Sequence, residues 1–252
     1  MSNETTRDTG RARLQLRRSY EIFKGDAGIL RATLHFSFGG HIDPDNNGIG
    51  MLEVLNHDTL TPGAFWPMHH HRDIEAISYV VKGEFEHADN LGNGGVLSAG
   101  GVQVMSLGRG AEHSERNHSS ERDLELVQMW LVPRRFGIEP SVQQRQHSED
   151  DRRNRLLRIV KPAGELGEGL EVEQDASVYV SHLDDGASVT HAIPAGHGAY
   201  LYVLQGRTEA NGERMASGDA AYLWSGGRLE LSATVPSELL LVDTALWRST
   251  IT

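Results

Sequence analysis

The chain has 252 residues, no cysteine and a formal net charge of −11 at pH 7. Its length fits one large or two small domains, and the missing cysteines exclude disulfides, thiolate metal sites and cysteine nucleophiles, consistent with a cytoplasmic protein. The acidic balance argues against direct nucleic-acid binding, and no apolar run approaches the roughly eighteen residues that a membrane span needs.

Residues 1–19 are polar and are expected to form a flexible lead-in without a secretory signal. From residue 29 onward, short β-like runs separated by glycine predict an all-β fold. The stretch 90–95 is rich in Gly and Asn and predicts a loop. The predicted strands of the first half are 29–36, 50–55, 75–81, 83–87, 102–106 and 124–132, the last apolar enough to be buried on both faces.

Residues 134–158 are highly charged and are expected to link two domains, with a helical turn at 148–153. The chain then repeats itself loosely, since 199–206 echoes 76–83 and a hairpin turn is expected at Asn211 and Gly212. Such self-similarity predicts two duplicated barrels. The predicted domains are 20–133 and 159–252, and the predicted strands of the second are 177–183, 199–206, 218–223 and 238–243.

The pair His69 and His71 is followed by His113 and Glu115 at the same spacing. Side chains alternate along a strand, so the members of each pair point to one face while His70 points to the other. Two such pairs brought together form a set of three imidazoles and one carboxylate. That set suits one divalent transition metal that keeps open positions for water or substrate.

The second half has no histidine at the matching positions, which are occupied by Pro194 and Leu231. We therefore expect the second barrel to lack the metal site. His191 and His197 lie nearby but out of register, and the alternative is that they form a weaker, separate site.

These residues resemble the two motifs of the cupin superfamily, which are matched by Gly63, His69, His71, Glu75 and Gly83, and by Gly110, His113 and Asn117. The stretches 69–83 and 92–115, and the segment 36–44, more specifically resemble the pirin family, and the likeness extends over most of the chain from about Tyr20. Two departures are Ala99-Gly100-Gly101 in place of the usual Pro-Gly-Asp, and His70 in place of the usual proline. The resemblance implies two tandem cupin β-barrels.

The pirin resemblance also implies a ligand set, namely His69, His71, His113 and Glu115. In the general cupin pattern the carboxylate comes from the first motif instead, which would be Glu75. We favour Glu115 as the ligand.

Glu75 is then expected on the inward face of its strand, beside the metal. Either Glu75 or Glu115 would take the proton from a substrate hydroxyl. The alternative for Glu75 is a salt bridge at the rim with Arg72 or Arg109.

For bacterial pirin-like proteins the resemblance implies quercetinase activity, in which a flavonol and O₂ give a depside and carbon monoxide. Fe(II) is the favoured metal, with Ni, Mn, Cu and Zn also compatible, because three nitrogens and one oxygen do not select among them. The expected partners are therefore a small aromatic substrate and O₂. The pocket for this substrate would be lined by Phe36, Phe38, Trp66 and Met105. The alternative is that these side chains belong to ordinary core packing.

A second function class stays open beside the enzyme. Eukaryotic pirins are described as metal-dependent regulators that act through protein partners, and the resemblance allows that role here. A third reading keeps the enzyme but changes the substrate to another enediol or catechol, since one cupin ligand set supports several reactions.

Overall fold

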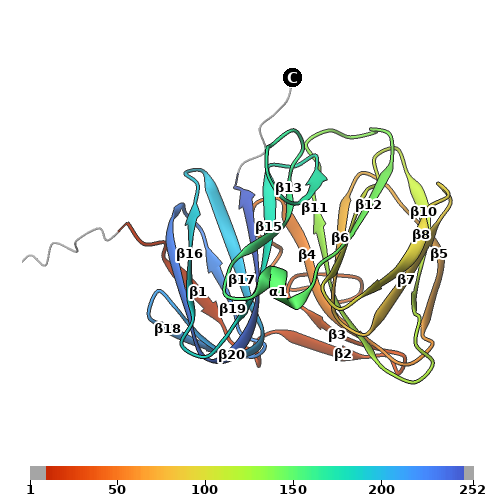
Figure 1. Cartoon of the computed structure of the whole chain (residues 1–252). Helices are drawn as coiled ribbons and strands as arrows, with labels where there is room; N and C mark the ends of the chain where they lie inside the picture. Colours follow the sequence, from red (N-terminus) through yellow and green to blue (C-terminus); the bar gives the residue numbers. More distant parts are fainter. Residues whose placement is uncertain (1–9, 247–252) are drawn as a thin grey trace, which may run out of the picture.

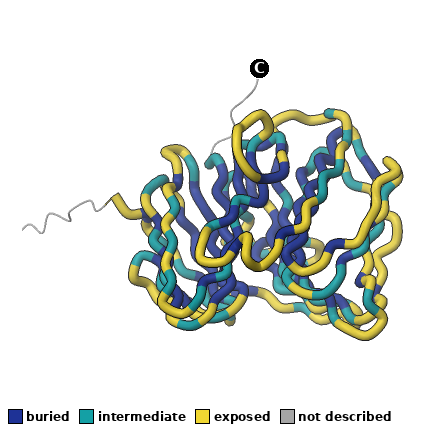
Figure 2. The backbone as a smooth tube through the Cα atoms, in the orientation of Figure 1, coloured by how far each residue is buried: buried dark blue, intermediate teal, exposed yellow. Residues whose placement is uncertain are grey.

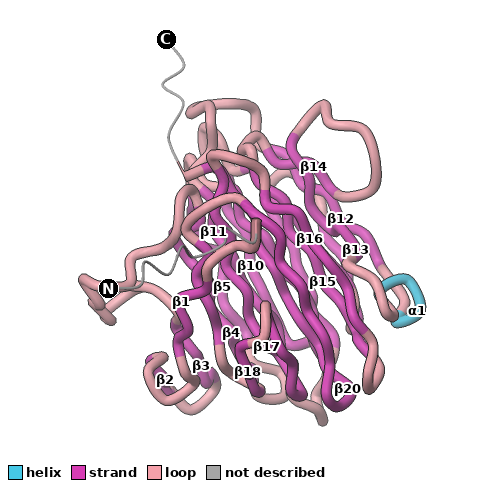
Figure 3. The backbone as a smooth tube through the Cα atoms, turned by 90° about the vertical axis from the view of Figure 1, so that its left-hand side faces the viewer, coloured by secondary structure: helices cyan, strands magenta, loops and turns pink. Residues whose placement is uncertain are grey.

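The computed structural model describes residues 10–246, which fold into two β-barrels lying side by side (Figure 1). Residues 1–9, which belong to the predicted lead-in, lie outside the described range. Strands dominate this range, and its one α-helix, α1 (Glu149–Arg152), sits at the edge of the molecule (Figure 3). No helix of the described residues is long and apolar enough to span a membrane. The predicted all-β class is therefore confirmed.

The first barrel is built from two sheets. The larger contains, in spatial order, β12 (Ser141–Gln146), β9 (Gly101–Ser106), β6 (Glu75–Lys82), β11 (Leu124–Leu131), β4 (Leu52–Leu60), β3 (Leu30–Leu34) and β2 (Phe23–Asp26). The smaller contains β5 (Phe65–His71), β10 (Ala111–Asn117), β7 (Glu84–Asp89) and β8 (Gly94–Ser98). The loop predicted at 90–95 is thus too long by two residues, because Gly94 and Gly95 already pair in β8.

One nine-stranded sheet forms the second barrel. Its strands are β1 (Leu14–Arg17), β13 (Leu157–Pro162), β14 (Leu170–Val172), β15 (Ala176–Leu183), β16 (Ser188–Ile193), β17 (His197–Ala210), β18 (Glu213–Ala216), β19 (Ala220–Leu223) and β20 (Gly227–Ala245). The flexible lead-in expected over 1–19 is wrong for β1, which pairs with β19. Alternation of Leu14 and Leu16 with polar residues was the signal for this strand.

The central strands of the seven-stranded sheet, β9, β6, β11 and β4, are largely buried, and the dark centre of the molecule in Figure 2 shows where such residues gather. Ile77, Val127 and Met129 face a core shared with the second barrel, where they join Val178 and Leu240. Alternate residues of the same strands face the interior of the first barrel. This arrangement confirms the prediction that the strand at 124–131 is covered on both sides, and it decides which residues can reach the site.

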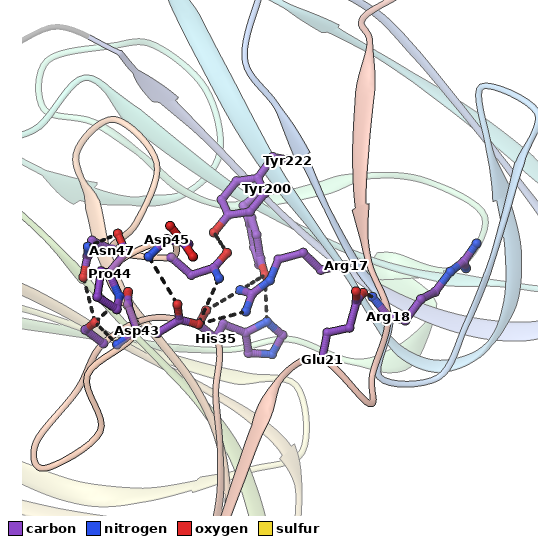
Figure 4. A network of polar contacts seen from close by, with 12 residues as sticks. Arg17, Arg18, Glu21, His35, Asp43, Pro44, Asp45, Asn47, Tyr200 and Tyr222 are labelled. Carbon is purple, nitrogen blue, oxygen red and sulfur yellow. Dashed lines mark hydrogen bonds and ion pairs between the residues drawn. The ribbon is translucent and has the colours of Figure 1, made fainter.

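Polar side chains also join the two barrels. Arg17 of β1 is buried between them, donates a hydrogen bond to the His35 carbonyl and lies 3.3 Å from the Tyr200 hydroxyl (Figure 4). A second buried group contains Arg152 of α1, which contacts both Glu238 and the Tyr79 hydroxyl. Charges buried in this way are costly unless they are paired, so both groups hold the barrels in one relative position.

Candidate metal centre

The three-His cluster, which consists of His69, His71 and His113, forms where β5 and β10 pair. These strands are antiparallel, and His113 lies directly opposite His69 in the register. The i, i+2 spacing puts His69 and His71 on one face of β5, as predicted. His70 is exposed on the other face, where its ring lies over Gly110.

The rings of the three-His cluster converge on one point. Their centroids are 4.4 Å apart for His69 and His113, 4.8 Å for His69 and His71, and 5.3 Å for His71 and His113. One ring nitrogen from each histidine lies within 4.8 Å of the other two. Three nitrogens at this spacing fit the first-row metals that imidazole prefers.

The protonation of these rings also fits a metal. Burial, together with the other histidines, lowers the pKa of His71 to about 4 and that of His113 to about 3. Both rings are therefore neutral near pH 7 and carry a lone pair. The Nδ1 atom of His69 donates a hydrogen bond of 2.9 Å to the Pro67 carbonyl oxygen. This contact leaves Nε2 as the ring atom that can bind a metal. Neither ring nitrogen of His113 has a hydrogen-bond partner among the described residues.

Glu115 lies two residues after His113, beyond an irregularity in the β5–β10 pairing. Its carboxylate accepts hydrogen bonds of 2.7 and 2.9 Å from the side-chain amide of Gln128 on β11. Burial raises the pKa of Glu115, although Gln128 and His69 act in the opposite direction. The sequence analysis did not identify Gln128 as a partner of Glu115. The pattern that could have shown it is one amide in the inward-facing, otherwise apolar series Leu126, Gln128 and Trp130.

Glu75 does not reach the cluster, which corrects the expectation that it lies beside the metal. It shares the phase of Ile77 and Tyr79 on β6, and these side chains face the core between the barrels. Its Oε2 atom accepts hydrogen bonds of 3.0 Å from the Ser106 hydroxyl and from the Glu173 backbone. The rim salt bridge with Arg72 or Arg109 is also absent, since those residues pair with Asp73 and Glu139 instead.

A cavity of about 190 Å³ opens beside the three-His cluster, and we call it the first-barrel cavity. Its apolar wall contains Leu30, Phe38, Leu60, Trp66, Phe85, Met105, Leu126 and Trp130. Three of the four predicted lining residues are therefore present. Phe36 is the exception, because β3 ends at Leu34 and the chain then turns Phe36 into the core between the barrels.

Two further polar groups near the cluster escaped the sequence analysis. Asp58 on β4 lines the first-barrel cavity with only 8% of its surface exposed. His87 on β7 is buried, and its ring centroid lies 5.6 Å from that of His113, while Asp89 is 3.9 Å away. The signal for His87 was the His-x-Asp pair at 87 and 89, whereas Asp58 stands in the polar run 56–59 of β4, which gives no sign of a buried carboxylate.

In the second barrel, His191 and His197 contact a shared carboxylate. The His191 Nε2 atom and the His197 Nδ1 atom each lie 2.7 Å from an oxygen of the buried Asp243. Both rings therefore use one nitrogen in a hydrogen bond to the protein. The two histidines that were considered as an alternative metal site are thus joined through the carboxylate of Asp243.

Comparison with known proteins identifies the family. A family model described as Pirin matches residues 15–131, and one described as the quercetinase C-terminal cupin domain matches residues 159–244. A pirin-like protein from Caulobacter vibrioides is 36% identical over 220 residues, which cover 87% of this chain and 94% of that protein. The chain belongs to the pirin family. The predicted fold of two tandem cupin barrels is thereby confirmed.

Two other pirin-type relatives bear on the site. A quercetin 2,3-dioxygenase from Escherichia coli is 33% identical over 230 residues, which cover 91% of this chain and 98% of that protein. The crystal structure of a bacterial pirin from Escherichia coli in complex with nickel(II) superposes with a TM-score of 0.86 at 31% identity, covering 93% of this chain and all of that one. In this chain the three-His cluster offers three imidazole nitrogens, the ligand type that first-row divalent metals accept.

Proposed function

We propose that this chain is a metal-dependent dioxygenase of the quercetinase type, which cleaves a flavonol or a similar chelating enediol with O₂. The observation that carries the proposal is the three-His cluster on the wall of a largely apolar cavity. The name of the Escherichia coli relative supplies the substrate class.

In this proposal, His69, His71, His113 and Glu115 hold the metal. A bound divalent transition metal supplies Lewis-acid attraction for the substrate oxygens and a path for electrons toward O₂. Gln128 holds the Glu115 carboxylate in place through both of its oxygens. Glu115 is also the group that accepts the proton of the chelating hydroxyl, because Glu75 lies on the other side of the sheet.

The apolar wall has two roles in the proposed reaction. Trp66, Phe85 and Trp130 offer flat surfaces for an aromatic substrate. A cavity lined by such side chains also keeps water away from the reacting carbon atoms. In the overall reaction both oxygen atoms of O₂ enter the depside, and one carbon of the flavonol leaves as carbon monoxide.

The test begins with metal-depleted protein reloaded separately with Fe(II), Ni, Mn, Cu or Zn. We expect O₂ uptake and loss of the flavonol absorption band with at least one redox-active metal, with carbon monoxide released in equal amount. His69→Ala should abolish the reaction. His70→Ala is the matched control, since His70 belongs to the same triplet but is exposed on the opposite face of β5. Absence of turnover with every metal, together with binding of a protein partner that depends on metal state, would favour the regulatory class.

A further inference from the structure

A second hollow lies next to the first-barrel cavity, and we call it the outer hollow. The two spaces share Leu30, Phe38 and Asp58 as lining residues. The remaining wall of the outer hollow includes Phe23 and Ile42, which are 44% and 79% exposed, so this end faces solvent. The two spaces are therefore adjacent: the first-barrel cavity lies beside the three-His cluster, and the outer hollow is open to solvent.

Asp58 stands at the junction of the two spaces and lacks a partner. Its Oδ1 atom is buried and has no hydrogen-bond partner among the described residues. The same holds for Oδ1 of Asn56, two residues earlier on the same face of β4 and also in the outer hollow. Buried acceptors without a donor are costly. Two such acceptors, at alternate positions of β4, indicate a surface that receives hydrogen bonds from a ligand.

We propose that the first-barrel cavity and the outer hollow form one elongated substrate site, in which Asp58 accepts a hydrogen bond from a hydroxyl on the part of the substrate that extends away from the three-His cluster. This inference rests on the proposed function and makes Asp58 a residue that determines which substrates bind: those with a hydroxyl group beyond the chelating oxygens are favoured.

The surroundings of Asp58 fit this role. Its neighbours in both spaces are chiefly apolar, among them Leu30, Phe38 and Leu60, so a ligand hydroxyl has few competing partners. Burial, and the nearby charge of Glu115, raise the pKa of Asp58 to about 7. A carboxyl oxygen accepts a hydrogen bond in either protonation state. A buried acceptor discriminates strongly between ligands with and without the hydroxyl group, because a ligand that lacks the hydroxyl leaves the acceptor unpaired.

The experiment measures binding without turnover. Zn(II)-loaded protein is titrated anaerobically with quercetin, and with a quercetin derivative that is O-methylated at every hydroxyl except the chelating one. Quenching of tryptophan fluorescence reports binding, since Trp66 and Trp130 line the cavity. We expect the wild-type chain to prefer quercetin by about 10- to 100-fold, the range of a hydrogen bond to a charged group.

In Asp58→Leu the preference should fall to about 3-fold or less, and in Asp58→Asn it should be reduced but retained, since the amide oxygen still accepts. Thr59→Val is the matched control on the opposite face of β4 and should keep the full preference. Full preference in both Asp58 variants, or equal binding of the two ligands by the wild-type chain, overturns the inference. Preference that depends on Asp58 without O₂ uptake by Fe(II)-loaded protein would instead leave the binding site standing and remove the proposed reaction.

Discussion

The position of Glu75 leads to a prediction about stability rather than catalysis. Its side chain is fully buried between the barrels, and burial raises its pKa to about 7, although hydrogen bonds from Glu173 and Ser106 act in the opposite direction. In an unfolded chain a glutamate titrates near 4.3. The folded protein therefore binds a proton on Glu75 over a pH range in which the unfolded chain has lost it.

The sign and size of the effect follow from linkage. Between about pH 4.5 and pH 7 the folded state holds more protons than the unfolded state at this site, so raising the pH destabilises the protein. A difference of roughly 2.5 pH units at 1.36 kcal/mol each gives about 3 kcal/mol, which is fully expressed above pH 7. Glu75→Gln removes the ionisation and keeps an oxygen that accepts from Ser106 and Glu173.

The assay is urea denaturation of metal-free protein at intervals from pH 4 to pH 8.5. Other groups titrate as well, so the informative quantity is the free energy of unfolding of Glu75→Gln minus that of the wild-type chain. We expect this difference to rise by about 1.4 kcal/mol per pH unit between about pH 4.5 and pH 7 and then to level off. Glu112→Gln, at an exposed position of β10, is the control and should show no such rise. A flat difference, or one that falls with pH, would refute this account of Glu75.

Three further outcomes are expected. Metal analysis of the purified protein should find one divalent metal per chain, and His113→Ala should remove most of it without changing the far-UV circular dichroism. Gln128→Leu should weaken metal binding about 10- to 100-fold, measured by competition with a chelator, because it releases the Glu115 carboxylate; unchanged affinity would argue against Glu115 as a ligand. Gly83→Ala should lower the free energy of unfolding by about 1–3 kcal/mol, since Gly83 has φ of 87° and an added Cβ would lie 2.7 Å from the Asp123 carbonyl oxygen; a thermal melt unchanged by the substitution would contradict this.

The sequence by itself predicted the all-β class, most strands of the first barrel and the convergence of His69, His71 and His113. These conclusions rest on local patterns. Alternation along a strand sets which residues share a face, and glycine marks where a strand ends. Because the histidine pair lies within one strand, the common direction of His69 and His71 needed no knowledge of the rest of the fold.

Only the tertiary structure decided which face of β6 meets the metal. Period two shows that Glu75 and Ala76 point in opposite directions, but not which of the two directions is the barrel interior. A sheet buried on both faces removes the usual clue, because both sides of β6 are apolar. The strand β1 carries a local signal in the alternation of Leu14 and Leu16, but the sequence does not reveal its partner β19, which lies some two hundred residues away. Asp58 was hidden for a related reason, since an acceptor without a partner can be recognised only once all of its neighbours are in place.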